Sequence, residues 1–166
     1  MLINFSKWEE LFLEPNMIYE QEVVDFYTNL VILEGDVVSS NVKGVDIVFN
    51  ATKLGEILHI PFVGINEYHW GFDEHSSLPA KISQGRVNSR AQTVLKGIMR
   101  SLHTLLFEIV HKVILPRAHQ RHIASIRDMG LMNALECKER IDWPTLIIKH
   151  LARIVDPKLS SHQLAC

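Results

Sequence analysis

DVVSSNVKGVDIVF, residues 36–49, is the stretch of sequence that decides the fold class of this chain. It is rich in Val and Ile, which favour strands, and the pair Lys43-Gly44 favours a tight turn between two strands. We therefore predict a β-hairpin. An isolated hairpin is only marginally stable in water, so it should pack against helices or pair with a third strand, for which residues 31–34 are the candidate. The second strand alternates, and its apolar positions are Val45, Ile47 and Phe49.

Apolar residues at helical spacing predict about six helices around this hairpin. Asn50 and Asp142 are suitable N-cap residues, and Pro116 ends the fourth helix because proline cannot continue a helix. The predicted fold class is therefore α+β and predominantly α-helical, with one β-hairpin near residues 36–49. The predicted helices are 6–13, 16–30, 51–58, 94–113, 125–139 and 143–155.

The same spacing predicts which face of each helix is buried. The fourth helix has the widest apolar stripe, and we expect it to be interrupted near residues 97–101. The residues predicted to face the core are Tyr19, Val23, Phe26, Tyr27 and Leu30 in the second helix; Leu54, Ile57 and Leu58 in the third; Val94, Leu95, Ile98, Met99, Leu102, Leu105, Leu106, Ile109 and Val113 in the fourth; Ile126, Met129, Met132 and Leu135 in the fifth; and Leu146, Ile147, Leu151, Ile154 and Val155 in the last.

Length and composition indicate one globular domain. The chain has 166 residues, of which 47% are hydrophobic and 22% charged, and its formal net charge is −2. This near balance of charge gives no overall attraction to nucleic acid or to a membrane surface. We predict a single α-rich domain over residues 1–157 with a frayed tail at 158–166. Residues 61–90 are the least regular part, and a loop of that length is often functional.

No stretch of the sequence is long and apolar enough to cross a bilayer, and the N-terminal residues do not form the apolar core of a secretion signal. Cys137 and Cys166 are too far apart in the sequence to indicate a disulfide framework. We therefore expect a soluble, intracellular protein with no membrane contact. The sequence does not distinguish a nuclear from a cytoplasmic location.

Motifs for catalysis or cofactor binding are missing from the sequence. It has no nucleophile elbow, no phosphate-binding loop and no dinucleotide fingerprint. Cys137 is close to Glu136 and Glu139, whose negative charges disfavour a reactive thiolate. The nine histidines are not at zinc-binding spacing. We therefore predict that the protein is not an enzyme, and we expect no catalytic residue, no cofactor and no metal site.

One basic segment, residues 109–127, contains no acidic residue. Cationic side chains can bind nucleic-acid phosphates by displacing counterions. Four full charges over this segment are a modest density, so a solvated connector is our main interpretation and nucleic-acid contact is the alternative. The candidate nucleic-acid-binding residues are Lys112, Arg117, Arg121 and Arg127.

A family resemblance rests on segments that follow one another along most of the chain. They are Trp8 with Leu11 and Phe12, VDFYTNL at 24–30, VKGVDIVF at 42–49, LHIP at 58–61, LH at 102–103, ILPR at 114–117, MGLMNAL at 129–135 and IDWPTLI at 141–147. In this order they resemble the plant transposon protein domain, a family carried in retroelement-derived reading frames of plant genomes. The resemblance spans roughly residues 5–155.

This resemblance implies a retroelement origin but supplies no catalytic residues. It does not imply transposase activity, because an integrase core needs several paired strands that present three carboxylates, and this chain is predicted to have one hairpin. The sequence also lacks the three Cys and one His of a zinc knuckle. The expected function is a noncatalytic domain that acts through a protein partner or self-association. The alternative is a nucleic-acid-binding accessory domain that uses the basic segment.

Overall fold

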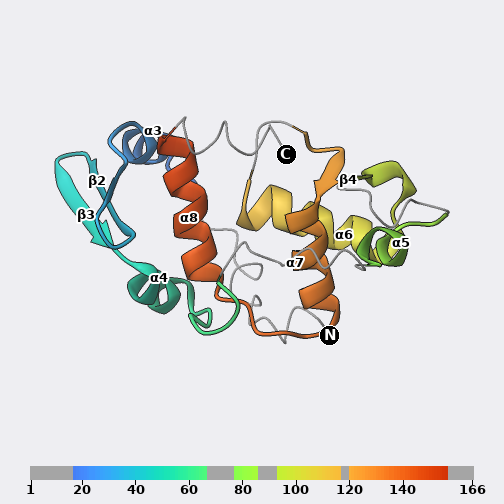
Figure 1. Cartoon of the computed structure of the whole chain (residues 1–166). Helices are drawn as coiled ribbons and strands as arrows, with labels where there is room; N and C mark the ends of the chain where they lie inside the picture. Colours follow the sequence, from blue (N-terminus) through green and yellow to red (C-terminus); the bar gives the residue numbers. More distant parts are fainter. Residues whose placement is uncertain (1–16, 67–76, 86–92, 117–119, 157–166) are drawn as a thin grey trace. The chain divides into compact units, whose positions relative to one another are not determined.

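The computed structural model describes residues 17–66, 77–85, 93–116 and 120–156 (Figure 1). The chain divides into two compact units. The sheet unit contains residues 17–66 and 141–156, and the helical unit contains the described residues from 77 to 140. The single domain over residues 1–157 stays a prediction, and both the predicted helix 6–13 and the tail 158–166 lie outside the described residues.

The sheet unit is built on three antiparallel strands in the order β1-β2-β3. Lys43 and Gly44 join β2 to β3 with φ angles of 49° and 83°, and two positive φ values are typical of the type I′ turn that matches the twist of a hairpin. The predicted hairpin is therefore confirmed, and β1 is the third strand expected near residues 31–34. The elements are α3 (Glu20–Thr28), β1 (Val31–Leu33), β2 (Val37–Val42), β3 (Val45–Phe49), α4 (Ala51–Leu58) and α8 (Trp143–Val155).

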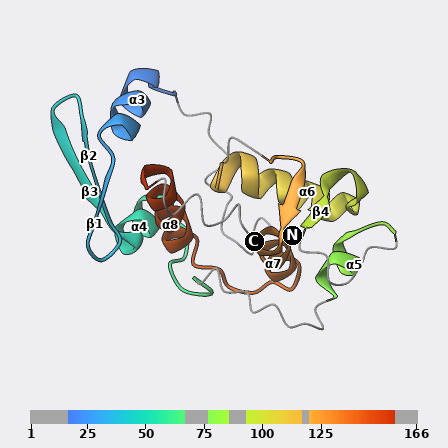
Figure 2. The same ribbon diagram turned by 45° about the horizontal axis from the view of Figure 1, so that its top comes forward.

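The core of the sheet unit lies between one face of the sheet and its helices. Val38, in β2, is fully buried and packs with Ile148 and Leu151 of α8. Phe26 of α3 stacks on Phe49 of β3, with ring centroids 6.3 Å apart. Figures 1 and 2 show α3 at the end of the sheet that carries the β2–β3 turn and α4 at the other end. All three helices therefore contribute to the same face of the sheet.

Two N-caps predicted from the sequence are present in the sheet unit. Asn50 Oδ1 accepts a hydrogen bond from the Lys53 amide at 3.0 Å and starts α4. Asp142 Oδ1 accepts one from the Thr145 amide at 3.1 Å and starts α8. The sheet unit is discontinuous in sequence, and an isolated parallel bridge between Ile65 and Ile141 joins its two parts.

The helical unit packs short elements around one almost fully buried helix, α7. A capping box starts this helix: Ser125 accepts from the Asp128 amide, and the Asp128 carboxylate accepts from the Ser125 amide. Strands β4 and β5 pair antiparallel, with Val94 opposite Ala124, and both of these side chains are buried. The elements are α5 (Leu78–Ile82), β4 (Thr93–Leu95), the 3-10 helix η1 (Lys96–Ile98), α6 (Ser101–Ile109), the π-helix η2 (Val110–Ile114), β5 (Ile123–Ser125) and α7 (Ile126–Glu136).

The predicted fold class is confirmed: within the described residues the chain is α+β, with six α-helices, the three-stranded sheet and a second, two-stranded antiparallel pair. The fourth predicted helix, however, begins at Ser101 rather than at residue 94. Residues 93–95 form a strand because they pair with 123–125, a distant segment that helical periodicity does not detect. The interruption expected near 97–101 is present as η1 and the extended residues that follow it. None of the described helices has the length and apolarity that a membrane span requires.

The buried face of α6 and η2 was predicted in the wrong orientation. His103, Leu106, Phe107 and Val110 are buried, whereas the predicted core residues Leu102, Leu105 and Val113 are exposed. Two causes explain the shift. Apolar residues occur almost all round this helix, and the two buried histidines, His103 and His111, were assigned to neither face. The π-helix also adds a residue to its turn, which rotates Ile114 inward in place of Val113.

Other predicted core positions are exposed because the helices extend beyond the surface that they cover. Leu151 is the last buried residue of α8, so the side chains one turn later remain in solvent. Among the described residues, α3 reaches the core at Phe26, near its C-terminal end, and Leu30 follows just after the helix. The predicted core residues found exposed in the sheet unit are Tyr19, Val23, Tyr27, Ile57, Ile154 and Val155, and those found exposed in the helical unit also include Leu95 and Ile98.

Candidate interaction surface

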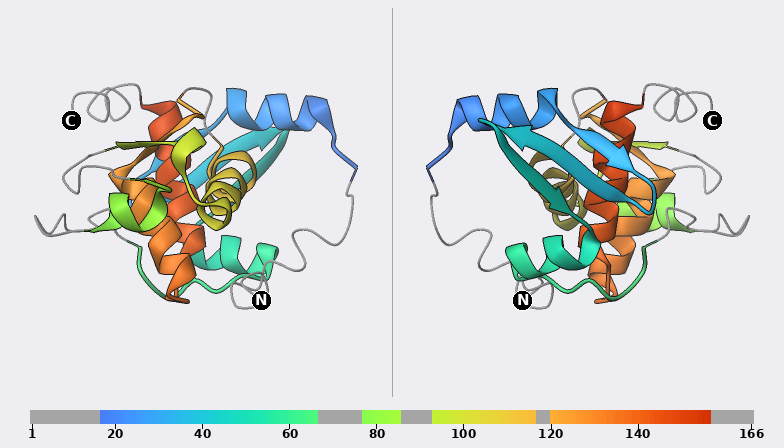
Figure 3. Two further views of the ribbon diagram at one scale, coloured as in Figure 1. Left: turned by 90° about the vertical axis from the view of Figure 1, so that its right-hand side faces the viewer. Right: turned by 90° about the vertical axis from the view of Figure 1, so that its left-hand side faces the viewer.

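The face of the three-stranded sheet opposite its helices carries four aliphatic side chains. Residues directly opposite one another in neighbouring strands point to the same face, so the register places Val31, Ser39 and Val48 in one row, and Leu33 and Val37 in the next. The four aliphatic residues of these two rows come from all three strands. Val31 and Leu33 are about half exposed and Val48 is 59% exposed. The right-hand view of Figure 3 looks onto this face, with the strands in front of α8. We call these four residues the outer face.

An apolar outer face is unusual in an antiparallel sheet, whose solvent side normally carries polar residues. The helices of the sheet unit bury the other face, around Val38, so they do not cover these side chains. The exposed aliphatic residues come from all three strands, although Ser39 lies between Val31 and Val48, and Asn41 and Asp46 lie on the same face. Patches of exposed aliphatic residues mark interaction sites in soluble proteins.

The outer face continues to an unpaired sheet edge. Strand β3 is at one side of the sheet, and no other strand of the described residues pairs with its free side. It has five residues and no proline, and its one charged residue is Asp46, whose carboxylate accepts a hydrogen bond from Asn41 Nδ2 at 2.7 Å. Edge strands are usually shortened, charged or covered, because their free backbone groups attract other strands. The outer face and the free edge of β3 together form what we call the open sheet surface.

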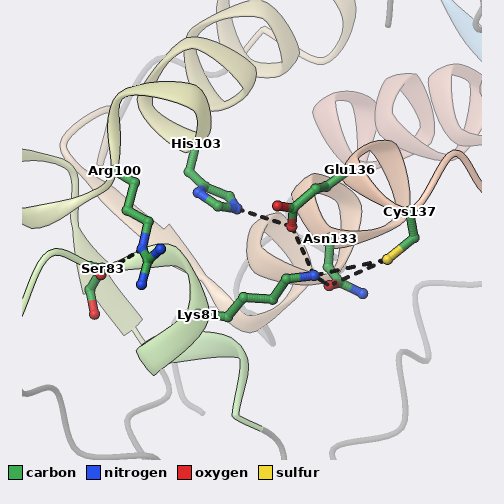
Figure 4. Close-up of polar contacts among 7 residues, drawn as sticks. All are labelled: Lys81, Ser83, Arg100, His103, Asn133, Glu136 and Cys137. Atoms are coloured by element: carbon green, nitrogen blue, oxygen red, sulfur yellow. Dashed lines mark hydrogen bonds and ion pairs between the residues drawn. The ribbon is translucent and has the colours of Figure 1, made fainter.

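A second candidate is the polar cluster of the helical unit (Figure 4). Lys81 extends from α5 toward the end of α7, where its Nζ lies 2.8 Å from Glu136 Oε2 and 2.7 Å from Asn133 Oδ1. His103 of α6 approaches the same carboxylate, with Nε2 3.5 Å from Glu136 Oε2. Separately, Arg100 Nε donates to the carbonyl of Ser83 at 3.2 Å. The cluster therefore joins three helices of one unit.

Charges in this cluster are matched. The hydrogen bond from Lys81 holds the pKa of Glu136 below its usual range, and the same contact raises the pKa of Lys81. Burial lowers the pKa of His103, more than the nearby Glu136 carboxylate raises it. At neutral pH the cluster thus contains an ammonium, a carboxylate and a neutral imidazole. The Lys81–Glu136 ion pair thus connects α5 to α7, and the imidazole of His103 is buried beside it.

Cys137 does not make this cluster a nucleophilic site. It is exposed and follows the last turn of α7, where Lys81 Nζ lies 3.9 Å from its sulfur. The imidazole of His103 approaches Glu136 instead of Cys137 (Figure 4). A thiol nucleophile needs a base within hydrogen-bond reach of the sulfur. Across the described residues, no group of three or more His, Cys, Asp or Glu side chains is placed to hold a metal ion.

A pocket in the sheet unit also lacks paired titratable groups. It has a volume of about 250 Å³ and lies between the β1–β2 turn and the first turns of α4 and α8. Asp36 is the titratable residue in its lining, so the pocket contains no acid–base pair. The remaining lining residues are Gly35, Asn50, Ala51, Thr52, Thr145 and Ile148.

The predicted basic segment lies partly within the helical unit. Lys112, in η2, forms an ion pair with Glu108, which also pairs with Lys96, and these two contacts lower the pKa of Glu108. Arg121 is exposed in the turn before β5, and Arg127 is half-buried in the first turn of α7. Arg117 lies outside the described residues. The described candidates thus come from three different elements, and the charge of Lys112 is offset by an acid.

Residues 4–165 match the family described as "Putative plant retrotransposon-related domain". The chain belongs to this family. The match covers nearly the whole sequence, which confirms the resemblance to plant transposon-derived domains. No curated protein and no solved structure matches the chain.

Sequence analysis of this retrotransposon-related domain did not identify the open sheet surface. The hairpin was predicted with one apolar face, but the aliphatic residues of the other face depend on β1, whose pairing with β2 places Val31 and Leu33 on the same face as Val48. The available signal was the aliphatic pair Val31 and Leu33 at alternate positions of β1. Metal, cofactor and catalytic residues were not predicted, and the candidate nucleic-acid-binding residues stay a prediction.

Proposed function

We propose that this retrotransposon-related domain is a noncatalytic self-association module, and that the open sheet surface is its contact site. The observation that supports this most directly is the apolar outer face, which combines side chains from all three strands on the side away from the helices. Burying exposed aliphatic side chains stabilises association in proportion to the apolar area removed from water. The free edge of β3 adds backbone groups that can pair with a second chain.

The noncatalytic part of the proposal is supported by the polar clusters. In the helical unit, Lys81 and Glu136 neutralise each other and His103 is buried beside them. A second buried pair, His111 and Asp128, lies 3.0 Å apart and connects η2 to the capping box of α7. Both sets of contacts join separate elements of the helical unit, which is a structural role.

The test is sedimentation velocity over a wide concentration range, compared with the 19.0 kDa monomer. Val48→Asp adds a charge to the outer face and to the β3 edge, and it should shift the protein to monomer at concentrations where the wild type associates. Val63→Asp is a matched control, because Val63 has the same exposure as Val48, 59%, but lies outside the sheet. A wild type that stays monomeric throughout, or equal effects of the two substitutions, contradicts the proposal.

The alternative function, nucleic-acid binding, has less support because Glu108 offsets the charge of Lys112. It predicts affinity for single- or double-stranded nucleic acid that falls steeply with salt. A titration of the wild type and of a Lys112→Ala, Arg121→Ala double variant measures it. Salt-sensitive binding that the double variant loses would replace self-association as the leading function if sedimentation shows only monomer.

A further inference from the structure

We propose that two copies of this chain pair antiparallel along β3, centred on Ile47, and so form one continuous six-stranded sheet. This inference rests on the proposed self-association and specifies its partner, its strand and its register. The alternative way to use the open sheet surface is to stack two outer faces against each other. The two arrangements place different residues in contact, so experiments can separate them.

β3 is the better of the two edge strands for such pairing. It has five residues, whereas β1 has three and is in contact with α8. No proline interrupts β3, and no other strand of the described residues pairs with its free edge. Because Val45 and Val48 are strongly exposed, a second strand can approach from this side.

The β2–β3 turn determines which backbone groups of β3 face outward. A two-residue turn is closed by a hydrogen-bonded pair, here Val42 with Val45, and hydrogen-bonded and open pairs then alternate along an antiparallel ladder. Counted from this turn, Val45, Ile47 and Phe49 direct their backbone groups at β2. Asp46 and Val48 therefore direct both of their backbone groups at the free edge.

These outward groups limit the register of a symmetric dimer. Outward groups must face outward groups, so the two-fold axis can pass through Asp46, Ile47 or Val48 but not between residues. An axis at Asp46 would place two carboxylates directly opposite each other, which is destabilising. An axis at Val48 would pair only part of the strand. An axis at Ile47 pairs all five residues, Val45 to Phe49, with the same five of the second copy.

Side chains are also compatible in the register centred on Ile47. Asp46 of each copy lies opposite Val48 of the other, and these two pairs exchange four backbone hydrogen bonds. Val45 lies opposite Phe49 of the second copy, so apolar side chains meet on the helix-covered face. Such an interface is isologous, because each copy contributes the same strand, and it closes at two chains.

Disulfide trapping tests the register. In a chain with Cys137→Ser and Cys166→Ser, cysteines are introduced singly as Ile47→Cys, Asp46→Cys and Val48→Cys. At the axis, the two copies of residue 47 form an open pair with Cα atoms about 4.5 Å apart, within the range that a disulfide spans. Ile47→Cys should therefore give most of the linked dimer, at twice 19.0 kDa, under mild oxidation. The cysteines at 46 and 48 are diagonal to their own copies, about 7–8 Å apart, and should link much less.

A charge substitution separates edge pairing from stacking of outer faces. Val48→Lys places an ammonium opposite Asp46 of the second copy, so the edge-paired dimer should keep its Kd within about threefold or bind more tightly. Val48→Asp places two carboxylates opposite each other twice and should weaken the dimer by at least about tenfold. Stacked outer faces would be disrupted by both substitutions, because either charge would be buried in an apolar interface.

The outcomes distinguish this inference from the function on which it rests. A wild-type dimer with preferential linking at residue 47 and tolerance of Val48→Lys supports the edge-paired sheet. A wild-type dimer that is broken equally by Val48→Lys and Val48→Asp, without preferential linking at 47, overturns the edge-paired sheet but retains self-association. A monomeric wild type overturns both. Circular dichroism of each variant confirms that it is folded.

Discussion

The orientation of α6 leads to a sharp prediction, because two adjacent leucines in this helix have opposite environments. Leu106 is 2% exposed, whereas Leu105 is 57% exposed. Both were predicted from the sequence to lie in the core. Leu106→Ala and Leu105→Ala make the same chemical change in the same helix, so they differ only in what surrounds the side chain.

The expected cost follows from this difference in burial. Replacing a fully buried leucine by alanine removes its packing and leaves a cavity, which costs about 2–5 kcal/mol in the free energy of unfolding, and we expect about 3 kcal/mol for Leu106→Ala. The substitution at Leu105 should change stability by no more than about 0.5 kcal/mol. For a chain of this size, about 3 kcal/mol corresponds to a fall in Tm of about 6–12 °C.

Urea unfolding monitored by far-UV circular dichroism measures the two variants beside the wild type. Because the chain has two compact units, hydrogen exchange of the α6 peptides should accompany it, so that the loss is located in the helical unit. Equal destabilisation by both substitutions, or a larger effect at Leu105, would refute the assigned face of α6. It would restore the orientation predicted from periodicity.

Three further predictions concern the pH dependence, a cap and a turn. Burial lowers the pKa of His103, so its contribution to stability is fully present above the ordinary value of 6.5 and falls as the pH drops below it, since the unfolded chain then binds a proton that the folded chain does not. The urea midpoints at about pH 7.5 and about pH 5.5 should therefore differ less in His103→Gln than in the wild type. An equal difference between the two midpoints in both proteins would contradict this. Ser125→Ala removes the capping box of α7 and should cost about 1 kcal/mol, whereas Ser125→Thr, which keeps the hydroxyl as both acceptor and donor to Asp128, should cost less. The two variants are compared by urea unfolding, and equal losses would contradict the assigned cap. Gly44→Ala places a Cβ on a residue with a φ of 83°, which should lower the free energy of unfolding by about 1 kcal/mol, although no atom lies within 4 Å of the added carbon. An unchanged urea midpoint would show that Gly44 is not in the left-handed region.

Local signals made the hairpin and several helix ends predictable. The turn at Lys43-Gly44, the N-caps Asn50 and Asp142, and the end of α8 before Pro157 each depend on a few neighbouring residues, and each agrees with the structure. Tertiary pairing was not predictable in the same way. β4 forms a strand only because residues 123–125 lie beside it, and a residue-by-residue pattern contains no information about that partner.

Histidine caused the main error in assigning the helix faces. His103 and His111 are polar in a sequence pattern, but each side chain is buried beside an acidic side chain of α7, so these two polar residues lie on the buried face of the helix. The candidate site was limited for a related reason. Val48 was recognised as an alternating residue of β3, but Val31 and Leu33, which share its face of the sheet, come from β1, through a pairing that the hairpin alone does not specify.

The discontinuity of the sheet unit has a consequence for synthesis on the ribosome. Strands β1 to β3 emerge early, but Ile148 and Leu151, which bury Val38, are translated only after the whole helical unit. During that interval both faces of the nascent sheet expose aliphatic side chains. A chain that stops before Trp143 lacks α8 and therefore cannot bury Val38 against it, so it should become a chaperone substrate. The packing of α8 completes the fold of the sheet unit.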